Sequence, residues 1–117
     1  MRHVATSRDV HDAKPLSEPV FLILASLAEH PRHGYALIQD IQQMSSERVI
    51  LSTGTLYGAL RRLLEDGMIE RFEQKDKSRD KQAYKLTLYG RRQLQTEISR
   101  MKELMRVVAS RVKEVEV

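Results

Sequence analysis

The chain has 117 residues, which is enough for one domain with a modest core but not for two. Hydrophobic residues make up 41% and charged residues 31%, a balance typical of a folded, helix-rich protein rather than a disordered one. Lys and Arg number 20 against 16 Asp and Glu, so the net charge of +4 leans only mildly toward acidic partners such as nucleic acid. Because there is no cysteine, disulfides, thiolate metal sites and a cysteine nucleophile are excluded.

No apolar run approaches the roughly 20 residues that a membrane-spanning helix needs. Residues 1–14 contain no continuous apolar segment that would act as a secretory signal. We therefore expect a cytoplasmic protein without a membrane partner. Residues 1–16 show neither helical nor strand periodicity, and we interpret them as a flexible arm.

Helix signals begin directly after this arm. Ser17, Glu18 and Pro19 combine a capping side chain, an acidic residue and a proline in the first turn, which predicts a helix start. The following segment, VFLILASLAEH, is apolar nearly all round and must be covered on more than one side. In so small a domain, part of that cover can come from a second chain.

Two further helices are predicted before residue 67. After the break at Pro31 and Gly34, YALIQDIQQM has a helical apolar stripe. The segment RVIL, residues 48–51, is rich in β-branched residues, and we predict a short strand there. Ser52 is placed to cap the third helix, and Gly67 fits the position after its C-terminus, where a left-handed backbone is needed.

The pattern then changes to that of a β-hairpin and a last helix. MIERFEQ and AYKLTL are predicted strands, and in the second we expect Tyr84, Leu86 and Leu88 to alternate with residues of the opposite face. Between them KDKSRDK holds seven polar residues and no apolar one, as a hairpin tip does. Thr87 can cap a long helix that runs to the last residue.

This order predicts a mainly α fold with a small β-wing, a winged helix-turn-helix followed by a long C-terminal dimerisation helix. We assign residues 1–16 to the arm, 17–88 to the winged helix-turn-helix, which is a DNA-binding domain, and 89–117 to the dimerisation helix. The third helix takes the recognition position.

The third helix, STGTLYGALRRLLEDG, has two contrasting faces. With about 100° per residue, Leu56, Leu60, Leu63 and Leu64 share one face, while Gly54, Gly58, Thr55, Arg61 and Arg62 lie on the other side. A face without side chains lets the backbone approach a groove wall, with hydroxyls and guanidiniums at its edges for phosphates or bases. The alternatives remain that Gly54 only permits a tight helix start, and that Tyr57 is a core-edge residue rather than a phosphate contact.

The wing is strongly basic. From Arg71 to Arg92 there are eight Lys or Arg against three acids. Such a run is often only a solvated surface. Beside a recognition helix, however, the four cations at the tip favour phosphate contact, which positions a protein without reading sequence: Lys75, Lys77, Arg79 and Lys81.

The last helix carries an apolar heptad seam with spacings of four and three residues: Leu94, Ile98, Met101, Met105, Val108, Val112 and Val115. Such a seam needs a partner. We favour homodimerisation, which would place two recognition helices on a near-palindromic duplex. The alternative is that the helix folds back on its own core.

Catalytic and metal chemistry are not expected. The sequence has no phosphate-binding loop and no paired-carboxylate cleft, and His30 and His33 lack an obvious third metal ligand. We therefore expect no enzyme, no metal and no cofactor, with His33 capping or bordering the second helix. The competing function is a winged-helix dimer that binds proteins without binding specific DNA, since the two share a fold.

Three segments in order resemble the PadR-like transcriptional regulators: HGYALIQDI (33–41), STGTLYGALRRLLEDGMIE (52–70) and AYKLTLYGRRQL (83–94). They carry the GTLY motif, the L-x-x-L-x-x-DG-x-I run and the Y-x-L-T-x-x-G junction, and the resemblance extends over residues 18–95. The single C-terminal helix is similar to the shorter subfamily, which dimerises through it.

The resemblance implies a homodimeric winged-helix regulator, usually a repressor, which a small phenolic or hydrophobic effector releases from double-stranded DNA. The motif positions imply DNA contacts at Thr53, Thr55 and Tyr57, and at His33 and Tyr35 where the second helix starts. Arg61 and Arg62 come from the helix faces rather than from the motif. The sequence departs from the family in having Thr53 where many members have proline, and in having no tryptophan for the aromatic sandwich that some members use.

Overall fold

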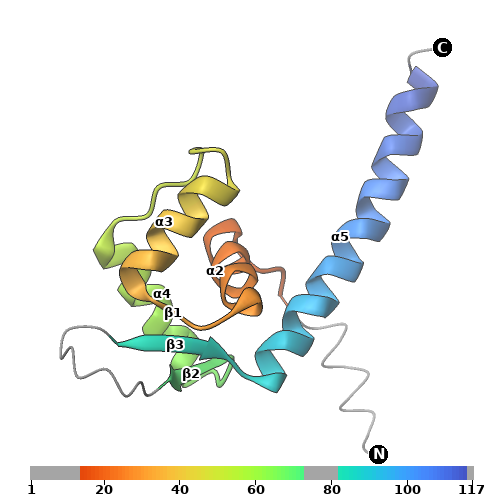
Figure 1. Ribbon diagram of the computed structural model, residues 1–117. Helices are drawn as coiled ribbons and strands as arrows, with labels where there is room; N and C mark the ends of the chain where they lie inside the picture. Colours follow the sequence, from red (N-terminus) through yellow and green to blue (C-terminus); the bar gives the residue numbers. More distant parts are fainter. Residues whose placement is uncertain (1–13, 73–81, 116–117) are drawn as a thin grey trace, which may run out of the picture. The chain divides into compact units, whose positions relative to one another are not determined.

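The computed structural model describes residues 14–72 and 82–115. Over these residues the elements are α2 (Glu18–Glu29), β1 (Arg32–His33), α3 (Gly34–Met44), α4 (Thr53–Glu65), β2 (Ile69–Phe72), β3 (Ala83–Leu86) and α5 (Leu88–Val115). Residues 17–94 form one compact unit, shown in Figure 1 with α2 and α3 to one side of the small sheet. Residues 14–16 and 95–115 belong to a second unit. The prediction of a mainly α fold with a small β-wing is confirmed.

The predicted helix boundaries are confirmed by their caps. The Ser17 hydroxyl accepts a hydrogen bond from the Val20 amide at 3.4 Å and begins α2. The Ser52 hydroxyl accepts one from the Thr55 amide at 3.1 Å and begins α4. After α4, Gly67 has φ of 76°, a left-handed conformation that glycine adopts without the steric cost of a side chain.

The sheet has the strand order β1-β3-β2, with both neighbouring pairs antiparallel. Tyr84 in the central strand lies opposite Arg32 of β1 and Arg71 of β2. The hairpin of β2 and β3 agrees with the predicted wing. The third strand comes from Arg32–His33, a segment in which we predicted only a chain break.

The predicted strand at residues 48–51 is wrong, and these residues form a bend followed by chain without regular secondary structure. The sheet is built from β1, β3 and β2, and the segment pairs with none of them. Leu51 instead precedes the Ser52 cap and is buried, as is Leu56 four residues after the cap. These two positions are those of a hydrophobic staple, which fixes how a chain enters a helix.

The predicted alternation along the last strand is also only partly right. Ala83 and Tyr84 are neighbours whose side chains point to opposite faces of β3, and both are buried, so burial does not alternate there. The strand ends at Leu86, and Leu88 is already the first residue of α5 and is exposed. The strand gives way to the helix at Thr87. Its hydroxyl accepts a hydrogen bond from the Gly90 amide at 3.0 Å and so caps α5 as predicted.

The core of residues 17–94 is built from one apolar stripe of each of its first three helices together with the sheet. The side chains that are almost completely buried are Ile23, Leu24 and Leu27 of α2, Leu37 and Ile41 of α3, Leu56 and Leu60 of α4, and Ile69 of β2. This core holds α4 with its leucines inward and leaves the opposite face of the helix outside.

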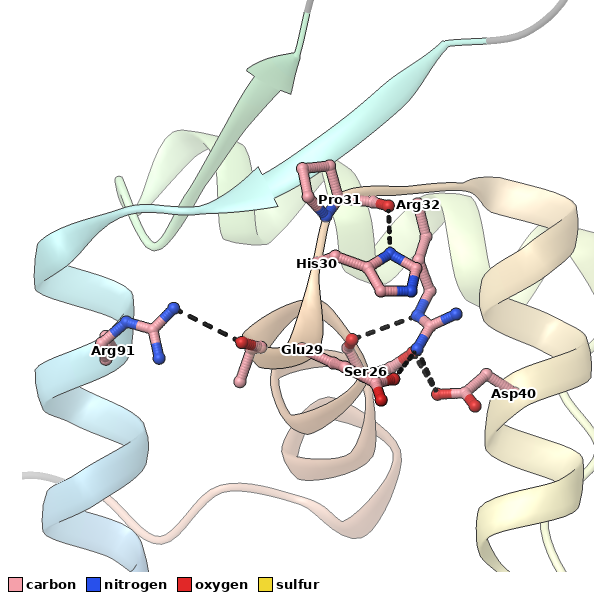
Figure 2. A network of polar contacts seen from close by, with 8 residues as sticks. Ser26, Glu29, His30, Pro31, Arg32, Asp40 and Arg91 are labelled. Carbon is pink, nitrogen blue, oxygen red and sulfur yellow. Dashed lines mark hydrogen bonds and ion pairs between the residues drawn. The ribbon is translucent and has the colours of Figure 1, made fainter.

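A polar network joins the end of α2 to β1 and α3 (Figure 2). The Arg32 guanidinium donates to the Ser26 carbonyl oxygen at 3.1 Å, pairs with Glu29, and lies 3.4 Å from the Asp40 carboxylate. The Ser26 hydroxyl donates to the same carboxylate at 2.5 Å. Arg32 is mostly buried, so these contacts compensate its desolvation and fix the position of α3 relative to α2.

The first turn of α5 is fixed against the turn between α4 and β2. The Thr87 hydroxyl donates to the Gly67 carbonyl oxygen at 2.7 Å, and the Thr87 amide donates to that of Met68 at 3.1 Å. A Cβ atom at Gly90 would lie only 2.0 Å from the Met68 carbonyl oxygen, so glycine is required there. Of the helices within the described residues, none has the length and apolar composition that a bilayer span requires.

Candidate nucleic-acid interface

The two faces of α4 are placed much as predicted. Its buried residues are Leu56, Ala59, Leu60 and Leu63, while Leu64 is half-buried. The inward face is therefore turned slightly toward Ala59, and Leu64 lies at its edge. The predicted contact residues of the helix are all exposed: Thr53, Thr55, Tyr57, Arg61 and Arg62.

The outward face of α4 has open space where two side chains are missing. A Cβ atom built on Gly54 or on Gly58 would meet no other part of the described chain within 4 Å. Packing against the described residues therefore does not require glycine at either position. Glycine in a helix interior costs about 1 kcal/mol relative to alanine, and no contact within residues 14–72 and 82–115 compensates that cost on the outward face of α4.

Arg61 and Arg62 are exposed in the last two turns of α4. Among residues 14–72 and 82–115, neither guanidinium forms an ion pair with a carboxylate. Their charge is therefore not neutralised by that part of the chain and is available to an anionic partner.

The side chain of Tyr57 packs against α3 at its hydroxyl end and is otherwise partly exposed. A Cβ atom on Gly34 would lie 2.3 Å from the Tyr57 hydroxyl oxygen, so the end of the Tyr57 side chain rests directly on the first residue of α3. The side chain nevertheless remains 46% exposed. The pKa of Tyr84 is raised, mainly by burial and further by Tyr57, with Arg71 acting in the opposite direction. Tyr57 thus lies where α4, the start of α3 and the wing meet.

The start of α3 brings the other two predicted residues next to this junction. His33 occupies the capping position, as predicted, but its side chain makes no capping hydrogen bond. Its Nδ1 atom is buried, and no partner for it lies in the described part of the chain. Tyr35 is strongly exposed in the first turn. Because Gly34 contacts Tyr57, His33 and Tyr35 lie on either side of the residue at which α3 touches α4.

The four predicted cations of the wing tip, Lys75, Lys77, Arg79 and Lys81, lie outside the described residues. At the base of the wing the Arg71 guanidinium donates to the Gln82 side-chain oxygen at 3.2 Å. Lys85 lies 3.5 Å from the Glu70 carboxylate and 5.6 Å from the centre of the Phe72 ring. Arg71 remains exposed and faces Tyr84, which places one further cation beside the junction.

Sequence reasoning missed two residues of this surface. Gly34 was interpreted only as a chain break, although it provides the space that Tyr57 occupies. Ile50 was assigned to a strand, although it is 65% exposed just before α4. A glycine as the first residue of a helix was the available signal for Gly34, and nothing in the local sequence indicated the exposure of Ile50.

The described residues contain no group of three or more histidine or acidic side chains arranged to hold a metal ion.

The sequence and the arrangement of three helices, a small sheet and a long last helix are both similar to those of known proteins. Residues 23–96 match the model of the transcriptional regulator PadR-like family. The chain belongs to this family. As a PadR-like protein it is a transcriptional regulator with the winged-helix fold.

Solved PadR-like structures share this architecture. A PadR family transcription regulator from hypervirulent Clostridium difficile R20291 has a TM-score of 0.69 and 21% identity, covering 82% of this chain and 99% of that one. A padr family transcriptional regulator from Eggerthella lenta DSM 2243 has a TM-score of 0.65 and 27% identity, covering 80% of each chain.

A curated relative is longer than this chain. It is described as an uncharacterized 37.1 kDa protein in transposon TN4556 of Streptomyces fradiae and is 40% identical over 83 residues. The match takes in 71% of this chain but only 23% of that protein.

The heptad seam of this PadR-like chain lies on α5. Leu94 is buried and Ile98 half-buried, whereas the seam is exposed further along the helix, at Met101, Met105, Val108 and Val112. The side chain of Val115 lies outside the described part.

Proposed function

We propose that this PadR-like chain binds double-stranded DNA sequence-specifically as a homodimer, with α4 of each copy in the major groove of a near-palindromic operator. The observation that carries the proposal is the bare outward face of α4. Gly54 and Gly58 border open space, and the exposed Arg61 and Arg62 lie on the same helix. The missing side chains bring the backbone close to a groove wall, and the guanidiniums reach phosphates or guanine edges.

The composition of the same face favours DNA binding over the competing function, that of a protein-interaction module. Protein interfaces gain most of their energy from a few bulky side chains, chiefly Trp, Tyr and Arg, in well-packed and desolvated pockets. The outward side of α4 offers two glycines, two threonines and two adjacent like charges, with Tyr57 partly occupied by its contact to Gly34. This composition suits a polyanion better than an apolar protein surface.

Salt dependence of duplex binding tests the proposal. A duplex recovered by selection with the purified protein should bind with an affinity that falls steeply between about 50 and 200 mM salt, because each phosphate contact releases counterions. Arg61→Ala combined with Arg62→Ala should weaken binding and reduce the salt slope by about two if both contact phosphate. Binding that is insensitive to salt would favour the protein-interaction module.

A matched control for the loss of two positive charges removes two cations of α5 that lie outside the heptad seam. Arg106→Ala with Lys113→Ala removes the same charge from exposed positions. This control should leave the affinity within about twofold, and both double variants should melt as the wild type does. If the Arg61/Arg62 variant loses stability, these arginines are structural and the assignment is wrong.

The exposed part of the seam supports the homodimer. A second copy is the partner of matching heptad spacing that would cover Met101, Met105, Val108 and Val112. Met101→Lys should dissociate the dimer in sedimentation velocity, because it places a charge in an apolar seam. Ser99→Lys adds the same charge at an exposed position outside the seam and should sediment as the wild type. A Met101→Lys variant that remains a dimer would remove the seam from the interface.

Repression relieved by a small phenolic or hydrophobic effector completes the proposal, and its support is the family resemblance. A reporter under the selected operator should be silenced by the protein. A phenolic acid such as p-coumarate should raise the Kd of the purified protein for that operator. A reporter that is activated would reverse the sign of regulation without affecting the DNA-binding proposal.

A further inference from the structure

The part of α4 that would enter a groove first carries only short side chains. Thr53, Gly54 and Thr55 are exposed in its first turn, and Gly58 follows one turn later over open space. The helix has no charged or amide side chain before Arg61. The long side chains that usually read guanine and adenine edges are therefore missing from its first two turns.

Exposed side chains near the start of α4 carry methyl groups instead. Ile50 precedes the Ser52 cap by two residues and is 65% exposed, while its neighbour Leu51 is buried. This contrast in burial places the two neighbouring side chains on opposite sides of the chain. With Leu51 inward, Ile50 points outward beside the start of α4. In Figure 1 this segment returns along α3 to reach the start of α4.

The hydroxyl of Thr55 is partly engaged in the cap. The Ser52 hydroxyl donates to the Thr55 hydroxyl oxygen at 3.0 Å and accepts from the Thr55 amide at 3.1 Å. These two bonds hold the Thr55 side chain in place and occupy one of its acceptor positions. What remains for a partner is the hydroxyl hydrogen, one further acceptor position and a methyl group.

In the major groove an apolar group can recognise one feature of unmodified DNA, the C5-methyl group of thymine. We propose that the Ile50, Thr53 and Thr55 side chains read thymine methyl groups in each operator half-site, with Ile50 as a specificity-determining residue. Gly54 and Gly58 bring these short side chains close enough to reach the bases. The inference rests on the proposed function, since it requires α4 to lie in the major groove.

Replacing thymine by deoxyuridine tests the inference, because it removes the methyl group and leaves the base pairing unchanged. In the duplex recovered by selection, each thymine is replaced singly in both half-sites, and the Kd is measured at one salt concentration. We expect at least one position at which deoxyuridine weakens binding by about fourfold or more. Fourfold corresponds to ~0.8 kcal/mol, the value of one buried methyl-sized group.

Ile50→Ala assigns the contact to its residue. This variant should lose the discrimination between thymine and deoxyuridine at one position of the half-site and keep it at others. Met44→Ala, which shortens another exposed apolar side chain at the far end of α3, is the matched control and should keep every discrimination.

The outcomes separate the two proposals. Specific, salt-sensitive binding with no deoxyuridine effect at any position would overturn methyl reading and leave the proposed function intact. A deoxyuridine effect that is unchanged in Ile50→Ala, Thr53→Ser and Thr55→Ser would overturn the assignment to these side chains. Failure of the wild type to bind duplex DNA in a salt-dependent manner would refute the proposed function itself.

Discussion

Gly34→Ala tests the contact between the start of α3 and the middle of α4. The new Cβ atom would lie 2.3 Å from the Tyr57 hydroxyl oxygen and 2.9 Å from its ring carbon Cζ. Both distances are far inside van der Waals contact, so either the helices separate or the Tyr57 side chain rotates away. Tyr57 is half-exposed, so its side chain has room to rotate toward solvent, which makes rotation the less costly response.

The expected cost follows from two opposing effects. Overpacking costs about 1–3 kcal/mol, and replacing glycine by alanine in a helix returns up to about 1 kcal/mol. Gly34→Ala should therefore lower the free energy of unfolding by about 1–2 kcal/mol, measured as a shift of the urea midpoint at constant slope. In a Tyr57→Ala background the same change should be neutral or stabilising, giving a coupling of about 2 kcal/mol.

Gly54→Ala is the matched control, because it also adds a methyl group in the first turn of a helix but meets open space. It should be neutral or slightly stabilising. If Gly34→Ala is tolerated as well as Gly54→Ala, or costs the same with and without Tyr57, the contact does not explain the glycine.

Two further predictions concern α5 and its surroundings. Gly90→Ala places a Cβ atom 2.0 Å from the Met68 carbonyl oxygen, a backbone atom that cannot rotate away, so thermal unfolding should show a loss of at least about 3 kcal/mol; a melting temperature within a few degrees of the wild type would contradict this. The pKa of the buried Glu97 is lowered, chiefly by its hydrogen bonds to Arg100 and also by the one from the Leu16 amide. Because the folded pKa is below the unfolded one, this contribution to stability is present at neutral pH and is lost as the pH falls below about 4.3 through the folded value. Glu97→Gln should therefore melt lower than the wild type at pH 7, with the difference shrinking as the pH falls below about 4.3, and a gap that keeps its full size throughout the acid range would refute the assignment.

The helices and the hairpin could be predicted because their signals are local. Ser17, Ser52 and Thr87 are capping residues followed by apolar periodicity, and each begins a helix in the structure. Gly67 has the positive φ that its position after α4 predicted. These features depend on neighbours within four residues, which a single sequence displays directly.

The strand β1 could not be predicted because it exists only through a distant partner. Two residues, Arg32 and His33, have no visible periodicity, and they become a strand by pairing with Tyr84 and Ala83. For the same reason the β-branched segment 48–51 was mistaken for a strand. Its composition favours a strand, but the segment pairs with no strand of the sheet.

In the candidate site, too, some features follow from the local sequence and others depend on distant residues. The opposition of glycines and leucines on α4 follows from helix geometry, and the structure places both faces much as the sequence predicts. The packing reasons for Gly34 and Gly90 depend on Tyr57 and Met68, which are distant in the sequence. A single sequence cannot reveal which glycines face a neighbour and which face open space.

The most direct test of the bare face is Gly58→Ala, because stability and DNA affinity should change in opposite directions. The added methyl group meets no atom of the described chain within 4 Å, so α4 should gain up to about 1 kcal/mol of helix stability and the melting temperature should rise. If the backbone of α4 lies against a groove wall, the same methyl group should weaken binding to the selected duplex by tenfold or more. A variant that melts higher and binds the duplex as tightly as the wild type would contradict the central claim that this face lies against DNA.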